Sequence, residues 1–400
     1  MTRILFVDAD EHTLNCYRDI VAPLREEWEA HFAASGKQAV TLLKSTRFDV
    51  VISALILPDG SGADLLEGTR KLQPHAARLI LSAYSSVNEV LQVARSAHQI
   101  LIKPFETQEL METLQRATKL RDILDNESVR NLISSVDTLP VLPDVYLQIM
   151  EELRSKEPSM KRIGTIVESD IGLSATILRL VNSPYFGFMR KIKSPSQGIS
   201  LLGTDTLNGL VLSTGLMKQI DVNKYSSTIL SGVWKHSFRT ACYARQIAKM
   251  EHGETSFVEA CFNGGLLHDV GKIILAESAG AEYQTVLQLV EKTGHPLWRM
   301  ENGVFKVNHG DVGAYLLGLW GVDQGSVEAV WRHHRLERLE DQGFTPAAVV
   351  HVANYIDNTS RLGESGHGVD PICSAWLEKN DLTEHVELWQ ESCLGLNDNK

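Results

Sequence analysis

The chain has 400 residues, of which 43% are hydrophobic and 22% charged, a composition typical of a globular protein with two or three domains. Its formal net charge of -11 lacks the basic surplus of nucleic-acid-binding proteins, so we expect no nucleic-acid partner. The five cysteines are scattered without a CxxC pair, and no apolar run approaches the roughly 18 residues of a membrane span. We therefore expect a cytoplasmic protein with no signal peptide and no membrane partner.

Residues 1–120 alternate short apolar runs with helical patterns. Apolar runs predict buried strands at 4–7, 49–53, 78–83 and 99–105. Helical patterns lie between them, including 38–44 and 87–97, whereas EAHFAAS at 29–35 is assigned to no element. Strands and helices that alternate at this spacing form a parallel sheet covered on both faces. Such sheets bind ligands beyond the carboxyl ends of their strands.

This region resembles, over its whole length, the receiver domain of bacterial response regulators. The matching landmarks are the acidic end of the first strand, LPDGSG at 57–62, LSA at 81–83 and KPF at 103–105. The resemblance implies a flavodoxin-like, doubly wound (βα)5 fold in which an Asp at the end of the third strand accepts a phosphoryl group. The position four residues before Pro58 is Ala54, and a methyl group cannot form an acyl phosphate.

The other residues expected at the phosphorylation site form an incomplete set. The acidic pair that ends the first strand reads Asp8–Ala9, followed by Asp10. Because Mg²⁺ needs several oxygen ligands in a tight octahedron, we expect no Mg²⁺ binding here. Ser82 and Lys103 occupy the positions that touch the phosphoryl group in the family. We therefore expect a pseudo-receiver that retains these side chains as remnants and works unphosphorylated, as a docking or dimerisation surface.

Residues 107–134 carry apolar side chains at three- and four-residue spacing, which predicts a helix longer than a receiver domain needs. The pattern fits either a connecting helix that forms a dimer seam or a domain helix followed by a solvated linker. We place the connector at 121–137, before the prolines of LPVLP at 139–143. A homodimer is one of the two arrangements that this pattern allows.

From residue 138 the strand-like runs end and helical patterns dominate, which predicts an all-α domain over 138–357. Asp170 is expected to cap one of its helices, and Pro195 to begin another. Residues 358–400 predict one or two short helices followed by a disordered end, and they suggest no chemistry. The side chains expected to cover the domain core are Trp376, Leu377, Val386, Leu388 and Trp389.

The stretch GGLLHDVGK at 264–272 places a His–Asp pair, His268 and Asp269, at the end of an apolar helical run. These adjacent side chains can direct a nitrogen and a carboxylate at one metal ion, and the Asp can also bridge to a second ion. The simplest interpretation of the pair alone is a capped helix end with Lys272 near it.

A second resemblance covers residues 135–355. The stretches LPVLPDVYLQIM, SDIGLSATILRLVNSPYFG, SPSQGISLLGTDTLNGLVL, WKHSFRT and LLHDVGK occur in the order found in HDOD domains. These domains are relatives of the HD-type metal phosphohydrolases, which include the HD-GYP enzymes that cleave cyclic di-GMP. The resemblance implies metal ligation by His236, His268, Asp269, His309, His333, His334 and Asn354. Asn354 stands where the family has an Asp, and Asp357 and His351 lie about one turn from it.

These features support a bacterial two-component regulator in which the pseudo-receiver controls an HDOD output domain. The output domain would bind a signalling protein, such as a phosphodiesterase, a diguanylate cyclase or a histidine kinase of a phosphorelay, and act on cyclic-dinucleotide turnover. The neutral side chain of Asn354 and the absence of a GYP signature after His334 favour this function over catalysis.

The alternative is a metal-dependent phosphohydrolase of cyclic di-GMP or a nucleotide. Asp269 would be its catalytic residue and position the attacking water, with Fe, Mn or a similar divalent metal in the pocket. A third function, a scaffold with both sites inactive, predicts that neither metal nor nucleotide raises the thermal stability of the protein.

Overall fold

The computed structural model divides into two compact units, with the main boundary near residue 141. It describes residues 2–400 except 74–75, 83–96, 98, 104, 106, 112, 116–143, 154, 156, 182–191, 193, 219–226, 337–342, 363–368 and 399–400. The predicted connector at 121–137 lies outside the described residues, and so do positions 87–96 of the helix predicted between the last two strands.

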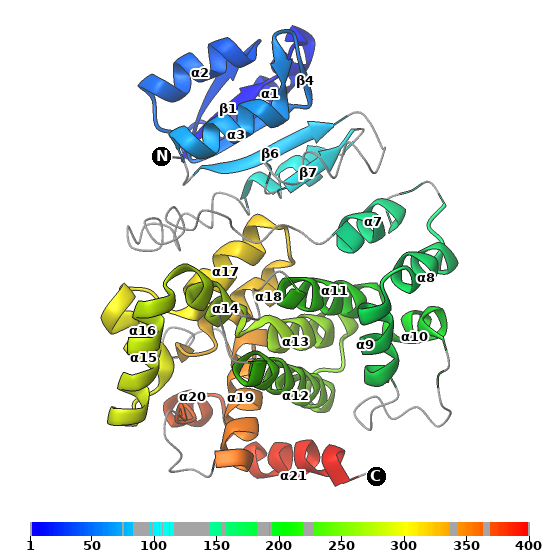
Figure 1. Cartoon of the computed structure of the whole chain (residues 1–400), viewed down its shortest axis with the longest axis vertical. Helices are drawn as coiled ribbons and strands as arrows, with labels where there is room; N and C mark the ends of the chain where they lie inside the picture. Colours follow the sequence, from blue (N-terminus) through cyan, green and yellow to red (C-terminus); the bar gives the residue numbers. More distant parts are fainter. Residues whose placement is uncertain are drawn as a thin grey trace. The chain divides into compact units, whose positions relative to one another are not determined.

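A five-stranded parallel sheet in the order β2–β1–β3–β6–β7 forms the N-terminal unit (Figure 1). The strands are β1 Thr2–Val7, β2 Trp28–Ala33, β3 Val50–Ala54, β6 Ala77–Ser82 and β7 Gln99–Ile102. The helical elements are α1 Glu11–Val21, η1 Ala22–Leu24, α2 Gly36–Ser45 and α3 Gly62–Leu72, and a hairpin of β4 Ile56–Leu57 and β5 Gly60–Ser61 precedes α3. This strand order is that of the flavodoxin-like fold, so the predicted fold class is confirmed.

Burial explains which strands the sequence predicts. Successive residues of β1 and β3, such as Leu5 and Phe6 or Val50 and Val51, are fully buried, because a parallel sheet is covered on both faces. Strand β2 lies at the edge of the sheet and its central residues are only half-buried. Its sequence, WEAHFA, is correspondingly mixed, and for this reason the strand went unpredicted.

The described part of the C-terminal unit consists of helices, which confirms the predicted all-α class. The first are α7 Asp144–Leu153, α8 Met160–Glu168, α9 Ile171–Val181, α10 Pro195–Leu202 and α11 Thr204–Lys218. As predicted, Asp170 caps α9 by accepting a 2.9 Å hydrogen bond from the Leu173 amide, and Pro195 begins α10.

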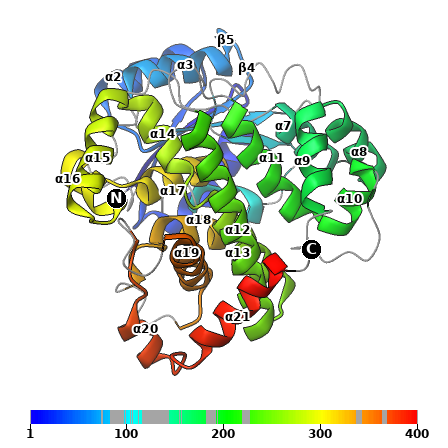
Figure 2. The same ribbon diagram turned by 60° about the horizontal axis from the view of Figure 1, so that its bottom comes forward.

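The later helices carry the core and the candidate site. They are α12 Ser227–Glu251, α13 Thr255–Leu267, α14 Val270–Ser278, α15 Gly280–Thr293, α16 Leu297–Phe305, α17 His309–Leu319, α18 Gln324–Arg332, α19 Pro346–Leu362, α20 Ser374–Lys379 and α21 His385–Asp398. Helices α12 and α13 lie side by side and α19 packs against both (Figures 1 and 2). Among the helices described, none has the length and apolar character needed to cross a bilayer.

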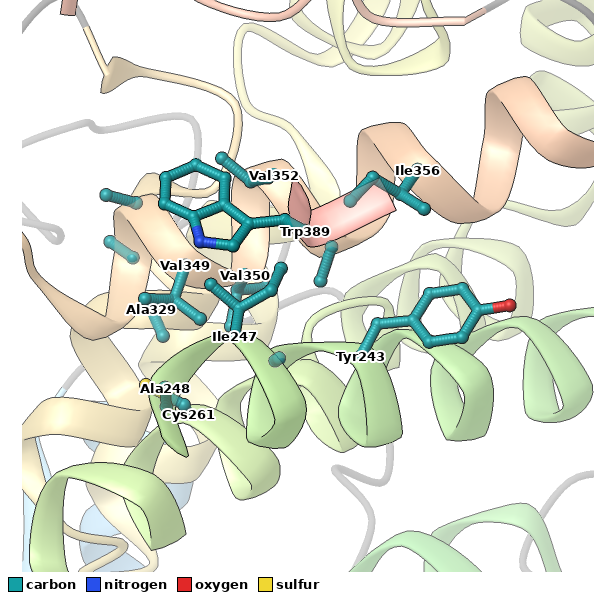
Figure 3. Close-up of a cluster of buried hydrophobic side chains, with 14 of the residues drawn as sticks. Tyr243, Ile247, Ala248, Cys261, Ala329, Val349, Val350, Val352, Ile356 and Trp389 are labelled. Atoms are coloured by element: carbon teal, nitrogen blue, oxygen red, sulfur yellow. The ribbon is translucent and has the colours of Figure 1, made fainter. Parts of the chain in front are cut away.

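The last two helices share the core of this unit. Trp389 of α21 is fully buried in one cluster with Val349 and Val352 of α19 and Ile247 of α12 (Figure 3). Its indole also donates a 2.8 Å hydrogen bond to Glu251. Of the other tail residues predicted to cover the core, Trp376 and Leu377 are buried and Val386 is partly buried in the same cluster.

Two expectations for the tail are wrong. Leu388 is 57% exposed, because its neighbour Trp389 occupies the buried face of α21 and successive helical residues point about 100° apart. The end of the chain is also helical as far as Asp398.

A pair of acids between α11 and α13 predicts a pH-dependent stability. Burial, followed by the hydrogen bond and the charge of Asp205, raises the pKa of Glu259 from 4.5 to about 7. Between these two pH values the unfolded chain loses its proton while the folded chain keeps it, so this contribution to stability falls as the pH rises.

Glu259→Gln keeps the neutral form at every pH. We therefore expect the melting temperature of the variant, relative to the wild type, to be higher at about pH 8 than at about pH 5. Thermal unfolding at both pH values measures this difference, with Glu291→Gln at an exposed position as the control. If the melting temperatures of the variant and the wild type differed by the same amount at both pH values, the raised pKa of Glu259 would be contradicted.

Candidate metal centre and receiver site

Two groups of side chains in the C-terminal unit have the composition and spacing of metal sites. The first comprises His236, His268 and Asp269, and the second His309, His333 and His334. In each group the potential ligand atoms lie within 4.8 Å of one another. They come from α12, the junction of α13 and α14, the start of α17 and the end of α18.

Glycines in GGLLHDVGK allow these helices to approach. A Cβ atom on Gly265 would lie 2.8 Å from the Cα of Ala241 on α12. A Cβ atom on Gly271 would lie 1.9 Å from the carbonyl oxygen of His309. Real Cβ atoms do not come so close to backbone atoms, so these positions require glycine. Gly271 thus brings His309 to the His–Asp pair at the junction of the two helices.

Asp269 faces the imidazoles of both groups. Its Oδ1 is 3.3 Å from Nε2 of His268 and 3.4 Å from Nε2 of His309, and its Oδ2 is 3.7 Å from Nε2 of His236. Within the groups, Nε2 of His236 and Nε2 of His268 are 3.2 Å apart, and those of His309 and His334 are 2.9 Å apart. The two groups therefore form one continuous cluster around a single carboxylate.

Each of the five imidazoles bonds a protein oxygen through Nδ1. The partners are the carboxylates of Asp357 for His236 (2.6 Å), Glu301 for His309 (2.6 Å) and Asp370 for His334 (2.8 Å), and the carbonyls of Gly265 for His268 (2.8 Å) and Val330 for His333 (2.7 Å). Carbonyls and ionised carboxylates only accept hydrogen bonds, so in the neutral form of each ring Nδ1 carries the proton and Nε2 keeps a lone pair. Five Nε2 lone pairs thus point into the cluster.

The electrostatics favour ligands in the deprotonated form that metals require. Burial lowers the pKa of His268 to about 3 and that of His334 to about 4, and holds the pKa of His333 well below its usual value. Burial would raise the pKa of Asp269, but the imidazoles and Lys272 outweigh it and hold the pKa well below the usual range. The buried imidazoles of His268, His333 and His334 are therefore neutral, and Asp269 is ionised.

The N-terminal unit gathers its predicted remnants at the carboxyl ends of neighbouring strands. The Lys103 ammonium bonds Oδ2 of Asp8 at 2.9 Å, and the Asp10 amide donates to Oδ1 of Asp8 at 3.1 Å. Asp10 itself caps α1. Ala54 ends β3 and Ser82 ends β6.

Family models match both units. The model described as response regulator receiver domain matches residues 4–115, and the HDOD domain model matches residues 139–336. The chain joins a receiver domain to an HDOD domain. All of the clustered histidines and Asp269 lie within the matched HDOD residues, whereas Asp357 and Asp370 lie beyond them. A receiver domain coupled to an HDOD domain fits a signal-transduction regulator.

The chain is similar to a solved HDOD domain protein and, over part of its length, to two curated proteins. A crystal structure of an HDOD domain protein with unknown function from Geobacter sulfurreducens is 26% identical, with a TM-score of 0.52 over 67% of this chain and 88% of that one. An uncharacterized protein of Treponema pallidum is 22% identical over 58% of this chain and 45% of its own length. The regulatory protein LuxO of Vibrio parahaemolyticus is 28% identical over 35% of this chain and 32% of its own length. The chain thus spans less than half of either curated relative.

The HDOD domain brings together all the predicted ligands except Asn354. The amide oxygen of Asn354 accepts a 2.7 Å hydrogen bond from Asn358, and within the described residues its side chain makes no hydrogen bond to the histidine cluster. Asp357 and His351 contact histidines of the cluster through atoms other than the Nε2 nitrogens of those histidines. Asp357 accepts from Nδ1 of His236, and His351 bonds the carbonyl of His333 at 2.7 Å.

Sequence reasoning missed two carboxylates that hold the cluster. Glu301 of α16 is fully buried and bonds both the backbone and the ring of His309. Asp370 belongs to the tail, which suggested no chemistry, yet it orients His334 and accepts a 3.2 Å hydrogen bond from the Trp298 indole. Asp370 lies 36 residues from His334, so sequence spacing alone carried no signal for this contact.

Proposed function

We propose that this receiver–HDOD protein is a signalling regulator whose HDOD domain binds divalent metal and acts by binding a partner protein. The observation that carries the proposal is the convergence of Nε2 lone pairs. Two such atoms at 3.2 Å or 2.9 Å repel each other unless a cation lies between them. Oδ1 of Asp269 and Nε2 of His333 are, in addition, buried without a hydrogen-bond partner among the described residues.

The donor set fits a first-row divalent metal. Imidazoles suit iron, zinc, copper and nickel, and carboxylates suit manganese. From these metals we propose iron or manganese as the bound ion. The outer carboxylates on His236, His309 and His334 fix these rings and raise their basicity, as partners of metal-bound histidines do in other proteins. Metal that binds only the folded protein must raise its melting temperature, and that shift tests the proposal.

Burial supports binding over catalysis as the output. His268, His309 and His333 are fully buried, and Asp269 is 1% exposed. Little of the donor set therefore faces a substrate, and we propose that the metals stabilise a surface that a signalling enzyme of cyclic-dinucleotide turnover recognises. Co-elution of such an enzyme with metal-loaded but not with chelator-treated protein is the expected result. No partner, together with rapid hydrolysis by the isolated protein, would contradict it.

The position of Asp269 keeps phosphoester hydrolysis as a second candidate. Its carboxylate faces both groups of imidazoles, and Lys272 lies beside it at 2.7 Å. A metal pair held there would supply Lewis acidity and lower the pKa of a bound water. Hydrolysis of cyclic di-GMP or a nitrophenyl phosphodiester by the manganese- or iron-loaded protein, abolished by Asp269→Asn, would favour this function.

We propose further that the receiver domain works without phosphorylation. Ala54 offers no carboxylate to a phosphoryl donor, and the Lys103 ammonium pairs with Asp8 at 2.9 Å. We expect no stable incorporation of phosphate from acetyl phosphate.

The double variant Ala9→Asp, Ala54→Asp is the positive control, because it restores both missing carboxylates. Labelled phosphate retained after denaturation measures the reaction. Stable labelling of the wild type would overturn the pseudo-receiver proposal.

A further inference from the structure

The two halves of the histidine cluster differ in their number of donors. The first half offers Nε2 of His236, Nε2 of His268 and one oxygen of Asp269. The second half offers three imidazoles, those of His309, His333 and His334, and Oδ1 of Asp269, which has no hydrogen-bond partner among the described residues. The second half can therefore supply four protein ligands, the number found in closed tetrahedral sites, and the first half only three.

Cationic side chains compete with a metal ion in the first half. The Lys272 ammonium bonds Oδ2 of Asp269 at 2.7 Å, the oxygen nearer His236. Asp357, the carboxylate behind His236, is bonded by Arg239 at 2.5 and 3.2 Å and by Arg361 at 3.1 Å. A guanidinium nitrogen of Arg361 also lies 3.4 Å from Nδ1 of His236. Two arginines thus lie behind this half, and Lys272 occupies the oxygen of Asp269 that faces it.

Carboxylates surround the second half instead. Glu301 and Asp370 bond Nδ1 of His309 and His334. Among the described hydrogen bonds their remaining donors are neutral: the Tyr283 hydroxyl, the His309 amide and the Trp298 indole. Two buried carboxylates behind the imidazoles of His309 and His334 favour a cation, whereas the arginines behind the first half oppose one.

We infer that the two metal positions are unequal: the half formed by His309, His333 and His334 holds a resident ion, and the half formed by His236 and His268 exchanges its ion readily. This inference rests on the proposed metal binding. Arg239 and Arg361 contribute to the difference, because they neutralise the carboxylate of Asp357 behind His236. The exchangeable position is the one through which metal supply can regulate the protein.

Metal counting on the full-length protein tests this inequality. The protein is loaded with excess Mn²⁺, passed over a column with a weak chelator, and analysed for bound metal. We expect about one ion per chain to be retained and about one more to bind reversibly, at least roughly tenfold more weakly. His334→Ala should lose the retained ion, whereas His236→Ala should keep it and lose the reversible one.

A variant outside the ligand set guards against misfolding. Arg361 is 40% exposed, and Arg361→Gln removes one of the positive charges on Asp357 while it leaves all five imidazoles and Asp269 in the chain. We expect it to tighten the reversible ion by several-fold and to leave the retained ion unchanged. Two retained ions in the wild type would overturn the inference and leave metal binding intact. Loss of the retained ion in His236→Ala but not in His334→Ala would do the same. No metal under any condition would overturn the proposed function as well.

Discussion

Asp269→Asn is expected to weaken metal binding at both positions by more than about a hundredfold, beyond the range seen when an outer partner of a ligand is lost. Asp269 is the only carboxylate that the described contacts place between the two groups of imidazoles, within 3.4 Å of His309 on one side and 3.7 Å of His236 on the other. Asn preserves the shape but removes the charge, so neutral imidazoles alone would remain to bind a divalent cation.

Titration against a fluorescent chelator measures this loss. Asp370→Asn is the matched control, because it makes the same chemical change at a carboxylate that supports only His334. Its expected effect is a loss of about 10- to 100-fold at one position. Equal binding by Asp269→Asn and the wild type would show that the carboxylate is not a ligand.

Trp389→Ala is expected to destabilise the protein by about 3–5 kcal/mol, the range for removing a fully buried aromatic side chain. Trp389 is 0% exposed and packs in one cluster with Val349, Val352 and Ile247 (Figure 3). The substitution leaves a cavity between α21, α19 and α12, and it removes the indole donor to Glu251, a carboxylate that His385 also bonds. Urea unfolding of the metal-free protein measures the change in the free energy of unfolding.

Leu388→Ala is the control for this prediction. Leu388 precedes Trp389 on α21 but is 57% exposed, so its truncation should change stability by no more than about 0.5 kcal/mol. If the two variants were equally stable, the tail would not belong to the core of the HDOD domain.

The fold could be predicted from sequence wherever burial is continuous. Strands β1 and β3 are apolar at successive positions because both faces of the sheet are covered, and their sequences are unambiguous. Edge strand β2 is half-buried, and Glu29 and His31 interrupt the continuous apolar run that marks β1 and β3. Leu388 shows a different limit, since an apolar residue beside a buried tryptophan need not share its face.

The candidate site could be predicted only where motifs fix it. The histidines and Asp269 stand at motif positions, and the structure brings them together. Their outer partners lie far away in sequence, as with Asp357, which is 121 residues from His236. Such contacts depend on how the helices pack, so no local pattern reveals that Asp357 supports a ring while Asn354 bonds within its own helix.

The most direct measurement is the metal content of the purified full-length protein, by elemental mass spectrometry after expression with iron and manganese available. The wild type is expected to contain close to stoichiometric metal. His333→Ala should contain little, because its Nε2 is one of the buried lone pairs without a partner among the described residues. His295→Ala, at an exposed position between α15 and α16, should retain the wild-type amount. A wild type without metal, or an unchanged content in His333→Ala, would contradict a metal centre in this HDOD domain.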